Sequence, residues 1–412
     1  MRVQPAIAAS TVVIGVDLAK RSLVAMALHG DGRRTKPRKF KNELEGFEGL
    51  LAFCEESAAD SGGFVVAFEP TGHYGEPLVQ WLMDEGVALY QVQPLHTKRA
   101  KELFDGTRRK TDAKDALVIA ELCRRGTARP YAPLDGPFAE LRVLARQREQ
   151  LVKRRGQILN RLHRHLDVVF PELTRHFHRL DSAGCRYILK TAPLPRDILE
   201  HCPKDLAEGL RRATRGALDA AARVEQLRQA AARSKGVSRA TRSHRVALAQ
   251  GLDELAYVGS HIAKVERIMK SVLAEVDYAP RLLSIPNLGE ITAAILLAEF
   301  GDLREYRVAK QLIAMAGLDL VEHSSGNKKG RRHISRRGRR YVRQILYLAV
   351  LRLGWRVFGE HRRRLVEVNK LPATKAAVAN MCRLLRIIHA LVRDDVDFDV
   401  EHPALRAPEA AA

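Results

Sequence analysis

Four acidic residues in the first third of the chain occupy positions from which they could bind metal ions together. Asp17 closes a run of residues typical of a buried strand, and Glu69 directly follows a second such run. Asp112 and Asp115 are three residues apart at the start of a predicted helix, so they share one face. Converging carboxylates repel one another unless cations hold them, and their hard oxygen atoms suit Mg²⁺ or Mn²⁺.

The chemistry that this group of carboxylates would support is cleavage of a phosphodiester bond. Two ions roughly 3.5 to 4 Å apart could activate the attacking oxygen and neutralise the leaving one. Each residue also has a purely structural interpretation: Asp17 as a strand-end cap, Glu69 as part of a turn, and Asp112 with Asp115 as helix N-terminal residues favoured by the dipole. We favour the metal site because all four occur together in a strongly basic chain.

A mixed α/β layer is predicted to position these acids. Strand patterns cover residues 11–16, 22–28, 64–68 and 87–92, and helical patterns cover residues 45–57 and 74–85. The proline-rich loop 130–137 indicates the end of this layer, so we assign residues 1–133 to the nuclease domain.

Helical patterns replace the strands after this loop. Apolar residues recur at helical spacing over 138–169 and again over 246–276, which predicts two long helices paired as an antiparallel coiled coil. We assign 138–280 to a helical linker or dimerisation region. Its Ala/Arg-rich middle, 181–243, has weaker apolar spacing that does not predict its packing.

The last folded domain is assigned to residues 281–402, followed by an Ala/Pro-rich tail, 403–412, that we expect to be disordered. Residues 284–300 resemble a helix-hairpin-helix unit, which offers backbone N–H groups to phosphates. Asn287 stands where that motif usually has glycine, and asparagine tolerates the left-handed conformation required there.

The composition indicates a polyanionic partner. The 412 residues include 70 Lys+Arg against 48 Asp+Glu, a formal net charge of +22, which exceeds what solubility requires. No apolar run approaches the length of a membrane span, so we attribute the charge to nucleic-acid binding rather than to a membrane surface. The 5 cysteines form no C-x-x-C pair, which argues against a zinc knuckle or a disulfide framework and fits a reducing cytoplasm.

Several blocks of sequence resemble the IS110-type DEDD transposases, relatives of the Piv invertases. They are VDLAK at 16–20, EPTGHY at 69–74, KTDAKDA at 110–116 and a distal block over 285–341. The resemblance implies a RuvC-like, ribonuclease-H-like N-terminal domain whose acidic tetrad consists of Asp17, Glu69, Asp112 and Asp115.

The resemblance also implies a serine nucleophile in a separate, helical C-terminal transposase domain. Ser325, immediately before Gly326, aligns with the family's serine, and Ser324 and Ser335 are fallback candidates. A serine hydroxyl needs a base, a metal or an electropositive setting, and no His-Asp pair adjoins Ser325. Ions bound by the first domain could supply that activation. Without the resemblance, this Ser-Ser-Gly sequence would be interpreted as a polar turn.

A run of basic residues without any acidic one follows these serines. The predicted nucleic-acid-binding residues are Lys328, Lys329, Arg331, Arg332, Arg336, Arg337, Arg339, Arg340 and Arg343. Arginine binds phosphate oxygens in a forked geometry, and neutralised phosphates release counterions. The alternative is a solvated helical face; we favour a polyanion because unopposed like charges destabilise a fold.

We therefore predict a serine recombinase of a mobile insertion sequence, located in the bacterial cytoplasm at the nucleoid. It would cut and rejoin double-stranded donor and target DNA through a phosphoserine intermediate, using Mg²⁺ or Mn²⁺ at the tetrad, as a homo-oligomer (dimer or tetramer). The resemblance adds RNA binding, through a non-coding bridge RNA that pairs with both DNAs.

Two alternatives stay open at this point. One is a RuvC-like hydrolytic junction nuclease that uses only the tetrad and water, and Ser325→Ala would separate it from a recombinase because only a recombinase would lose its covalent protein–DNA species. The other is a non-enzymatic nucleic-acid-binding scaffold, for which Asp17→Ala would leave nucleic-acid processing and metal binding unaltered. The sequence does not specify the DNA sites, the sequence of the RNA or the size of the oligomer.

Overall fold

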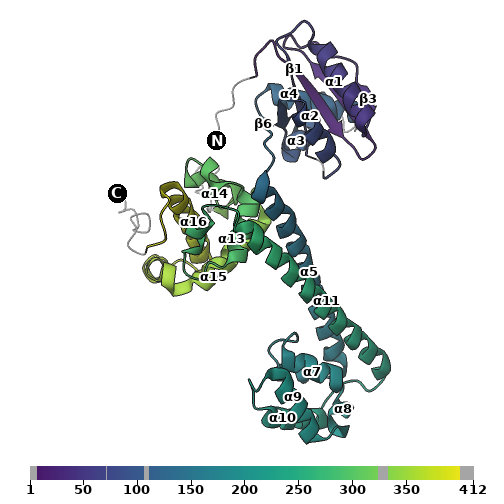
Figure 1. Ribbon diagram of the computed structural model, residues 1–412, viewed down its shortest axis with the longest axis vertical. Helices are drawn as coiled ribbons and strands as arrows, with labels where there is room; N and C mark the ends of the chain where they lie inside the picture. The colour runs from purple at the N-terminus through teal and green to yellow at the C-terminus, as the bar shows by residue number, and fades with distance from the viewer. Residues whose placement is uncertain (1–6, 71, 106–110, 323–332, 400–412) are drawn as a thin grey trace, which may run out of the picture. The chain divides into compact units, whose positions relative to one another are not determined.

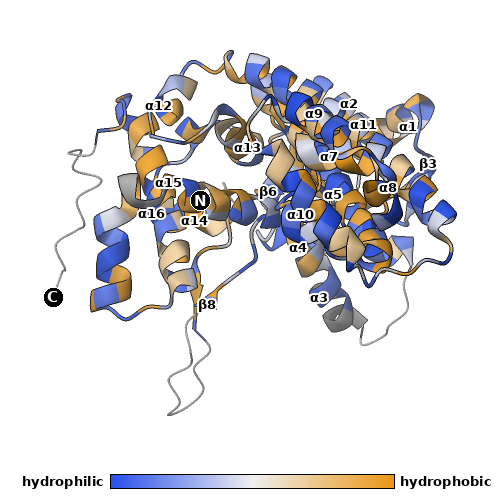
Figure 2. Ribbon diagram, turned by 90° about the horizontal axis from the view of Figure 1, so that it is seen from below, coloured by the Kyte–Doolittle hydropathy of each residue, from blue (hydrophilic) through white to orange (hydrophobic). Residues whose placement is uncertain are grey.

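The computed structural model describes residues 7–70, 72–105, 111–322 and 333–399 (Figure 1). The chain folds into two compact units, Met1–Pro133 and Leu134–Ala412. In Figure 2 most helices carry both hydrophobic and hydrophilic residues, as expected of helices that bury one face. None of the described helices combines the length and the apolar character needed to cross a bilayer.

The first unit is built on a six-stranded mixed sheet. Its strands lie in the order β3-β2-β1-β4-β5-β6. Their bounds are β1 Val12–Leu18, β2 Ser22–Leu28, β3 Arg38–Lys41, β4 Phe64–Phe68, β5 Leu89–Gln91 and β6 Arg129–Pro130. β1 pairs parallel to β4 and antiparallel to β2. The predicted mixed α/β layer is confirmed, but β3 was missed because its polar residues are mostly exposed.

Helices cover both faces of this sheet. They are α1 Leu44–Ala58, α2 Glu76–Asp84, α3 Pro94–Asp105 and α4 Asp112–Arg124. Alternate residues of β1 face opposite sides, so Val12 and Ile14 join a core with α1 and α2, whereas Val13 joins a core with α3 and α4. The sheet therefore has a buried layer on each side.

Gly15 allows α4 to lie directly on β1. A Cβ atom at this position would lie 2.0 Å from the carbonyl oxygen of Ala116 in the first half of α4. No other residue could occupy position 15 without moving the helix away from the strand. This close approach brings the N-terminal turn of α4 to the end of β1 where Asp17 lies.

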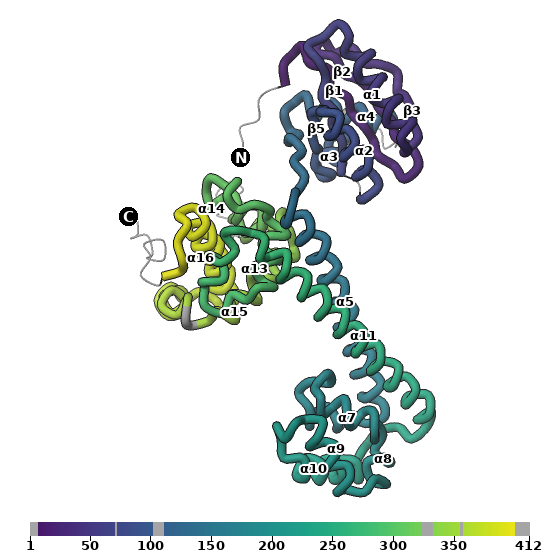
Figure 3. The backbone as a smooth tube through the Cα atoms, viewed as in Figure 1, coloured from purple at the N-terminus to yellow at the C-terminus, as the bar shows by residue number. Residues whose placement is uncertain are grey.

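Two long helices, α5 Gly136–Val169 and α11 Thr241–Leu273, run side by side in the second unit (Figure 3). Arg148 pairs with Glu266, and Arg161 pairs with Glu254. Because the partner's number falls as the first number rises, the two helices are antiparallel.

The segment between these helices forms a small helical bundle. Its helices are α6 Leu173–His176, α7 Ala183–Thr191, α8 Pro195–Glu200, α9 Pro203–Thr214 and α10 Ala220–Ala232. They share a core with Leu162 and Leu166 of α5 and with Leu248 and Leu252 of α11. This bundle is the packing that the apolar spacing of 181–243 did not predict.

The rest of the second unit includes α13, which spans Glu290–Phe300, packs against α5, α11, α12 and α15, and is buried along nearly its whole length. The other elements are α12 Ala279–Leu283, the 3-10 helix η1 Leu303–Glu305, α14 Ala309–Met315, β7 Leu320–Val321, β8 His333–Ile334, α15 Arg340–Arg363, the π-helical segment η2 Arg364–Val368 and α16 Ala373–Asp394. α15 is kinked at Gly354. In the turn before α13, Asn287 has φ 64°, so the left-handed conformation predicted for it is confirmed.

Candidate functional site

Two of the predicted site residues lie at the same edge of the sheet, on neighbouring strands. Asp17 is the last residue but one of β1, and Glu69 directly follows β4. These strands are parallel, with Val16 opposite Phe68, so Asp17 and Glu69 occupy the next positions in register. Parallel pairing therefore places both carboxylates at the carboxyl ends of their strands.

The other two acids lie in the first turn of α4. Thr111 caps this helix by accepting a hydrogen bond from the Lys114 N–H at 3.3 Å. Asp112 is exposed, whereas Asp115 is buried. The positive end of the helix dipole favours carboxylates in this turn, and the contact of α4 with β1 at Gly15 brings the turn to the strand end.

The electrostatics of Asp17 indicate that the four acids form one cluster. Burial raises the pKa of Asp17 to about 6, with further contributions from the negative charges of Asp115, Asp112 and Glu69; the positive charge of Lys101 acts in the opposite direction. Each charge contributes because it lies near Asp17. The structure thus brings three acids, predicted from separate parts of the sequence, close enough to Asp17 for their charges to act on it.

Lys101 of α3 belongs to this cluster, and the sequence analysis missed it. Its Nζ atom lies 2.7 Å from Oδ2 of Asp115. The other carboxylate oxygen, Oδ1, is buried and has no hydrogen-bond partner among the described residues. No spacing or motif in the sequence distinguishes this lysine from its basic neighbours.

The donor atoms of the cluster fit a hard divalent cation, although their side chains are not arranged as a complete coordination shell. Among the described residues, no three acidic, histidine or cysteine side chains form a ready metal-binding group. The unsatisfied Oδ1 of Asp115 and the raised pKa of Asp17 both indicate a shortage of positive charge. Carboxylate oxygens are the ligands that Mg²⁺ and Mn²⁺ prefer.

The predicted serines and part of the basic run lie outside the described residues. These are Ser324, Ser325, Lys328, Lys329, Arg331 and Arg332. The segments on either side pair as the antiparallel strands β7 and β8. Ser335, the remaining fallback serine, donates a hydrogen bond from Oγ to Oδ1 of Asp319, and its N–H donates to the Asp319 carbonyl at 2.8 Å.

The backbones at Gly317 and Gly338 approach each other closely at the base of this hairpin. A Cβ atom on Gly338 would lie 2.2 Å from the backbone nitrogen of Gly317, so neither position has room for a side chain. Arg343 donates from Nη1 to the carbonyls of Ala316 and Gly338, both at 2.9 Å. Of the predicted nucleic-acid-binding residues, Arg343 thus stabilises the local backbone.

Arg339 is also bound within the protein, by a carboxylate that the sequence analysis missed. Glu299 of α13 is fully buried; its Oε2 lies 3.0 Å from Nη1 of Arg339 and its Oε1 lies 3.4 Å from Nε of Arg146. Arg142 donates to the backbone carbonyls of Ala298 and Glu299. A carboxylate within the otherwise apolar stretch 291–300 was the available signal.

The remaining described members of the basic run are exposed to solvent, where they can contact a ligand. Arg336, Arg337 and Arg340 are exposed, on the turn after β8 and the first turn of α15. Arg336 adopts φ 55°, in the left-handed region. Three arginine side chains therefore reach solvent at the base of the hairpin.

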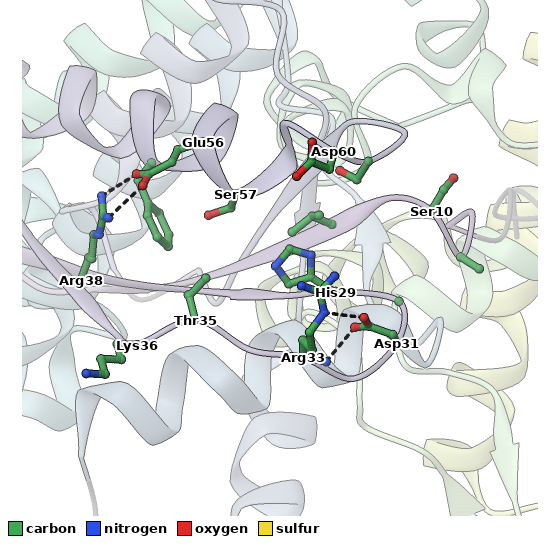
Figure 4. A pocket seen from close by; sticks show the side chains of 15 residues that line it. Ser10, His29, Asp31, Arg33, Thr35, Lys36, Arg38, Glu56, Ser57 and Asp60 are labelled. Carbon is green, nitrogen blue, oxygen red and sulfur yellow. Dashed lines mark hydrogen bonds and ion pairs between the residues drawn. The ribbon is translucent and has the colours of Figure 1, made fainter.

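A separate groove of about 620 Å³ lies at the other end of β1, around Val12 (Figure 4). Four of its charged side chains form two ion pairs, Arg38 with Glu56 and Arg33 with Asp31. None of the predicted site residues lines this groove. The acidic cluster is the better candidate for chemistry.

Comparison with known proteins identifies the chain's relatives. Residues 14–171 match the transposase family model DEDD_Tnp_IS110, and residues 279–365 match the model of the transposase IS116/IS110/IS902 family. Together the two matches cover more than half of the chain. The match over 14–171 includes most of the N-terminal domain, for which the RuvC-like fold was predicted.

Curated relatives match over most of their length. The chain is 28% identical over 341 residues to the insertion element IS116 uncharacterized 44.8 kDa protein of Streptomyces clavuligerus, covering 82% of this chain and 83% of the relative. It is 27% identical over 338 residues to the mini-circle putative transposase for IS117 of Streptomyces coelicolor, covering 79% and 80%. Among solved structures, T. thermophilus RuvC in complex with a Holliday junction substrate is 21% identical, with a TM-score of 0.23, over 29% of this chain and 99% of RuvC. The chain belongs to the IS110 family of DEDD-type transposases, enzymes that cut and rejoin DNA.

Proposed function

We propose that this transposase cuts DNA with divalent metal ions, Mg²⁺ or Mn²⁺, held by Asp17, Glu69, Asp112 and Asp115. The observation that carries the proposal is the geometry: parallel pairing places Asp17 and Glu69 at adjacent strand ends, and the contact at Gly15 brings the first turn of α4 to them. Burial and the other three carboxylates raise the pKa of Asp17, which supports it. Buried like charges are unfavourable, so a cluster of this kind is typical of a functional site. Bound divalent ions would neutralise it and supply charge stabilisation at the scissile phosphate.

The residues of the chain have distinct parts in this proposal. Asp17 and Glu69, on adjacent strand ends, would present oxygens from the rigid sheet. Asp115 would offer its unsatisfied Oδ1 from the buried face of α4, and Asp112 would offer its carboxylate from the exposed side. Ligands on strands and a helix hold their positions better than ligands on loops.

We further propose that DNA strands are joined transiently to Ser325, which lies outside the described residues. The serine Oγ would form a bond to phosphorus while a bond between phosphorus and a deoxyribose oxygen breaks, and the leaving oxygen would take up a proton. The fixed hairpin base at Gly317 and Gly338 and the exposed Arg336 and Arg340 support this placement, because they would hold a DNA phosphate near the hairpin.

Two substitutions test these steps in the full-length protein with labelled donor and target DNA. Asp17→Asn is expected to abolish strand cleavage and weaken Mn²⁺ binding. Ser325→Ala is expected to remove the covalent protein–DNA species seen on denaturing gels. Asp31→Asn, an exposed carboxylate in the groove at the other end of the sheet, is the matched control and should retain both. Continued cutting by Ser325→Ala without a covalent species would instead indicate a hydrolytic junction nuclease.

The proposed partners are donor and target duplex DNA and a bridge RNA, with the chain acting as a dimer or tetramer at the nucleoid. The net charge of +22 supports a polyanionic partner. Sequencing the nucleic acid that co-purifies with the protein tests the RNA: one discrete RNA is expected, and random fragments would contradict guidance. Light scattering with and without that RNA measures the oligomer.

The exposed arginines are proposed to bind phosphates. The logarithm of the affinity for duplex DNA falls linearly with the logarithm of the salt concentration. Replacing Arg336, Arg337 and Arg340 together by glutamine should reduce the steepness of this fall by about 3, roughly one per phosphate contact. Arg33→Gln, in the paired groove of the first unit, should leave this slope unchanged. An unaltered slope in the triple variant would show that these side chains do not meet DNA.

A further inference from the structure

Lys101 lies within the acidic cluster, where its ammonium group contacts a carboxylate that is also a proposed metal ligand. Its Nζ atom is 2.7 Å from Oδ2 of Asp115, whose side chain is only 6% exposed. A metal ion on the other oxygen, Oδ1, would share this carboxylate with the ammonium group, and two positive charges held that close together repel each other. Metal binding and the Lys101 contact are therefore coupled.

The lysine is held beside the cluster by the packing of its helix. Thr97 and Ala100 of α3 are buried, and Ala100 belongs to the core shared by α3 and α4. Because one face of α3 is anchored in this way, the neighbouring Lys101 side chain needs only to rotate about its own bonds to leave Asp115. Its side chain is 28% exposed, so it also has access to solvent.

The balance of charges indicates where Lys101 would go. At Asp17 the charges of Asp115, Asp112 and Glu69 act against that of Lys101, so negative charge predominates among the described residues named here. A divalent ion bound to Asp115 would repel the ammonium group from this carboxylate. A phosphodiester carries the single negative charge that this free ammonium group would then attract.

We propose that Lys101 is a further residue of the active site, whose ammonium group neutralises Asp115 until a divalent cation binds and then contacts a phosphate oxygen of the DNA. This inference rests on the proposed metal site. It makes Lys101 a built-in counter-cation, which keeps the buried carboxylate paired before metal and DNA arrive and adds positive charge at the scissile phosphate afterwards.

Metal titration of the chelator-treated, full-length protein tests the first half of the proposal. Lys101→Met should bind Mn²⁺ roughly five- to tenfold more tightly than the unmodified protein, because a competing cation is removed. Lys101→Arg should stay close to the unmodified protein. Lys98→Met, an exposed lysine on the same helix, is the matched control and should change nothing. If Lys101→Met does not fold, Lys101→Gln carries the same expectation.

A further variant separates this proposal from the metal site on which it rests. Asp115→Asn should weaken Mn²⁺ binding. If Asp115→Asn has no effect, the proposed metal site is wrong. If Asp115→Asn weakens binding but neither Lys101→Met nor Lys101→Gln strengthens it, the metal site stands and the role of Lys101 is overturned.

DNA binding tests the second half. Affinity for a duplex of arbitrary sequence is measured in Ca²⁺, another hard cation for carboxylates, and in EDTA. Lys101→Met should lose about two- to fivefold in affinity in Ca²⁺ and much less in EDTA, since the ammonium group is free only when metal is bound. An equal loss in both conditions, or no loss in either, would overturn the transfer of Lys101 to phosphate.

Discussion

Replacing Glu299 with glutamine removes a buried negative charge that holds several arginines together. The Glu299 side chain is fully buried, with Arg339 at 3.0 Å and Arg146 at 3.4 Å. Arg142 donates a hydrogen bond to the Glu299 backbone carbonyl at 3.2 Å. Burial and the nearby charge of Arg339 lower the pKa of Arg142 to about 10, against the opposing effect of Glu299. Without Glu299 these guanidinium groups repel one another in a poorly solvated site.

The cost can be worked from these distances. Two unit charges 3.0 Å apart interact by about 5 kcal/mol at an effective dielectric constant of about 20. Glutamine retains one hydrogen bond to Arg339, and the half-exposed Arg146 regains water, which offsets part of this loss. Removing one partner of a buried ion pair costs about 3–5 kcal/mol. We therefore expect Glu299→Gln to lower the free energy of unfolding of the second unit by about 3 kcal/mol and its melting temperature by roughly 6–12 °C.

Thermal unfolding followed by circular dichroism measures this loss. The matched control is Glu290→Gln on the same helix, since Glu290 pairs with Lys270 but both side chains are about half exposed. Such a surface pair contributes at most about 1 kcal/mol. If Glu299→Gln is no more destabilising than Glu290→Gln, the buried carboxylate does not hold the arginines and the reasoning fails.

Other predictions concern the second unit alone. Hydrogen bonds from Arg179 and then Arg155 lower the pKa of Asp181 to about 2. The ionised Asp181 therefore stabilises the fold above about pH 4, and this contribution disappears as the pH falls towards 2. Asp181→Asn should lower the free energy of unfolding by about 2 kcal/mol at pH 7 and flatten the acid-denaturation curve, and an unchanged curve would contradict these hydrogen bonds. Gly338→Ala should destabilise by about 2 kcal/mol or more in urea unfolding because its Cβ would meet backbone atoms. At Gly156 in α5 a Cβ atom would meet nothing within 4 Å, so Gly156→Ala should instead stabilise the protein by about 0.5–1 kcal/mol. Equal effects of the two substitutions would refute the close approach of Gly338 to Gly317.

Local patterns were sufficient to predict β1, β2, β4 and β5 and the family. The apolar runs at β1 and β4 predicted buried strands, and the acids at their ends were predicted to converge because carboxyl ends of strands in one sheet meet at its edge. The left-handed turn at Asn287 followed from the side chain's tolerance of that conformation, and the structure confirms it. The roles of the four acids and of Ser325 stay predictions.

Other features could not be predicted because they depend on contacts between distant segments. β3 has a polar, exposed pattern and becomes a strand only by pairing with β2. The bundle between α5 and α11 has weak apolar spacing because its core is completed by residues of those two helices. Short-range periodicity carries no information about such partners.

The sequence by itself determined the residue types, the spacing that forms each strand and helix, and the net charge that selects a polyanion. Only the tertiary structure decided that α4 rests on β1 at Gly15, that Lys101 pairs with Asp115, and that Glu299 receives Arg339. The physical reason is that a strand or helix forms from residues that are neighbours along the chain. The protonation and pairing of a charged group depend instead on every charge, and every surface that excludes water, that folding brings within a few ångströms of it.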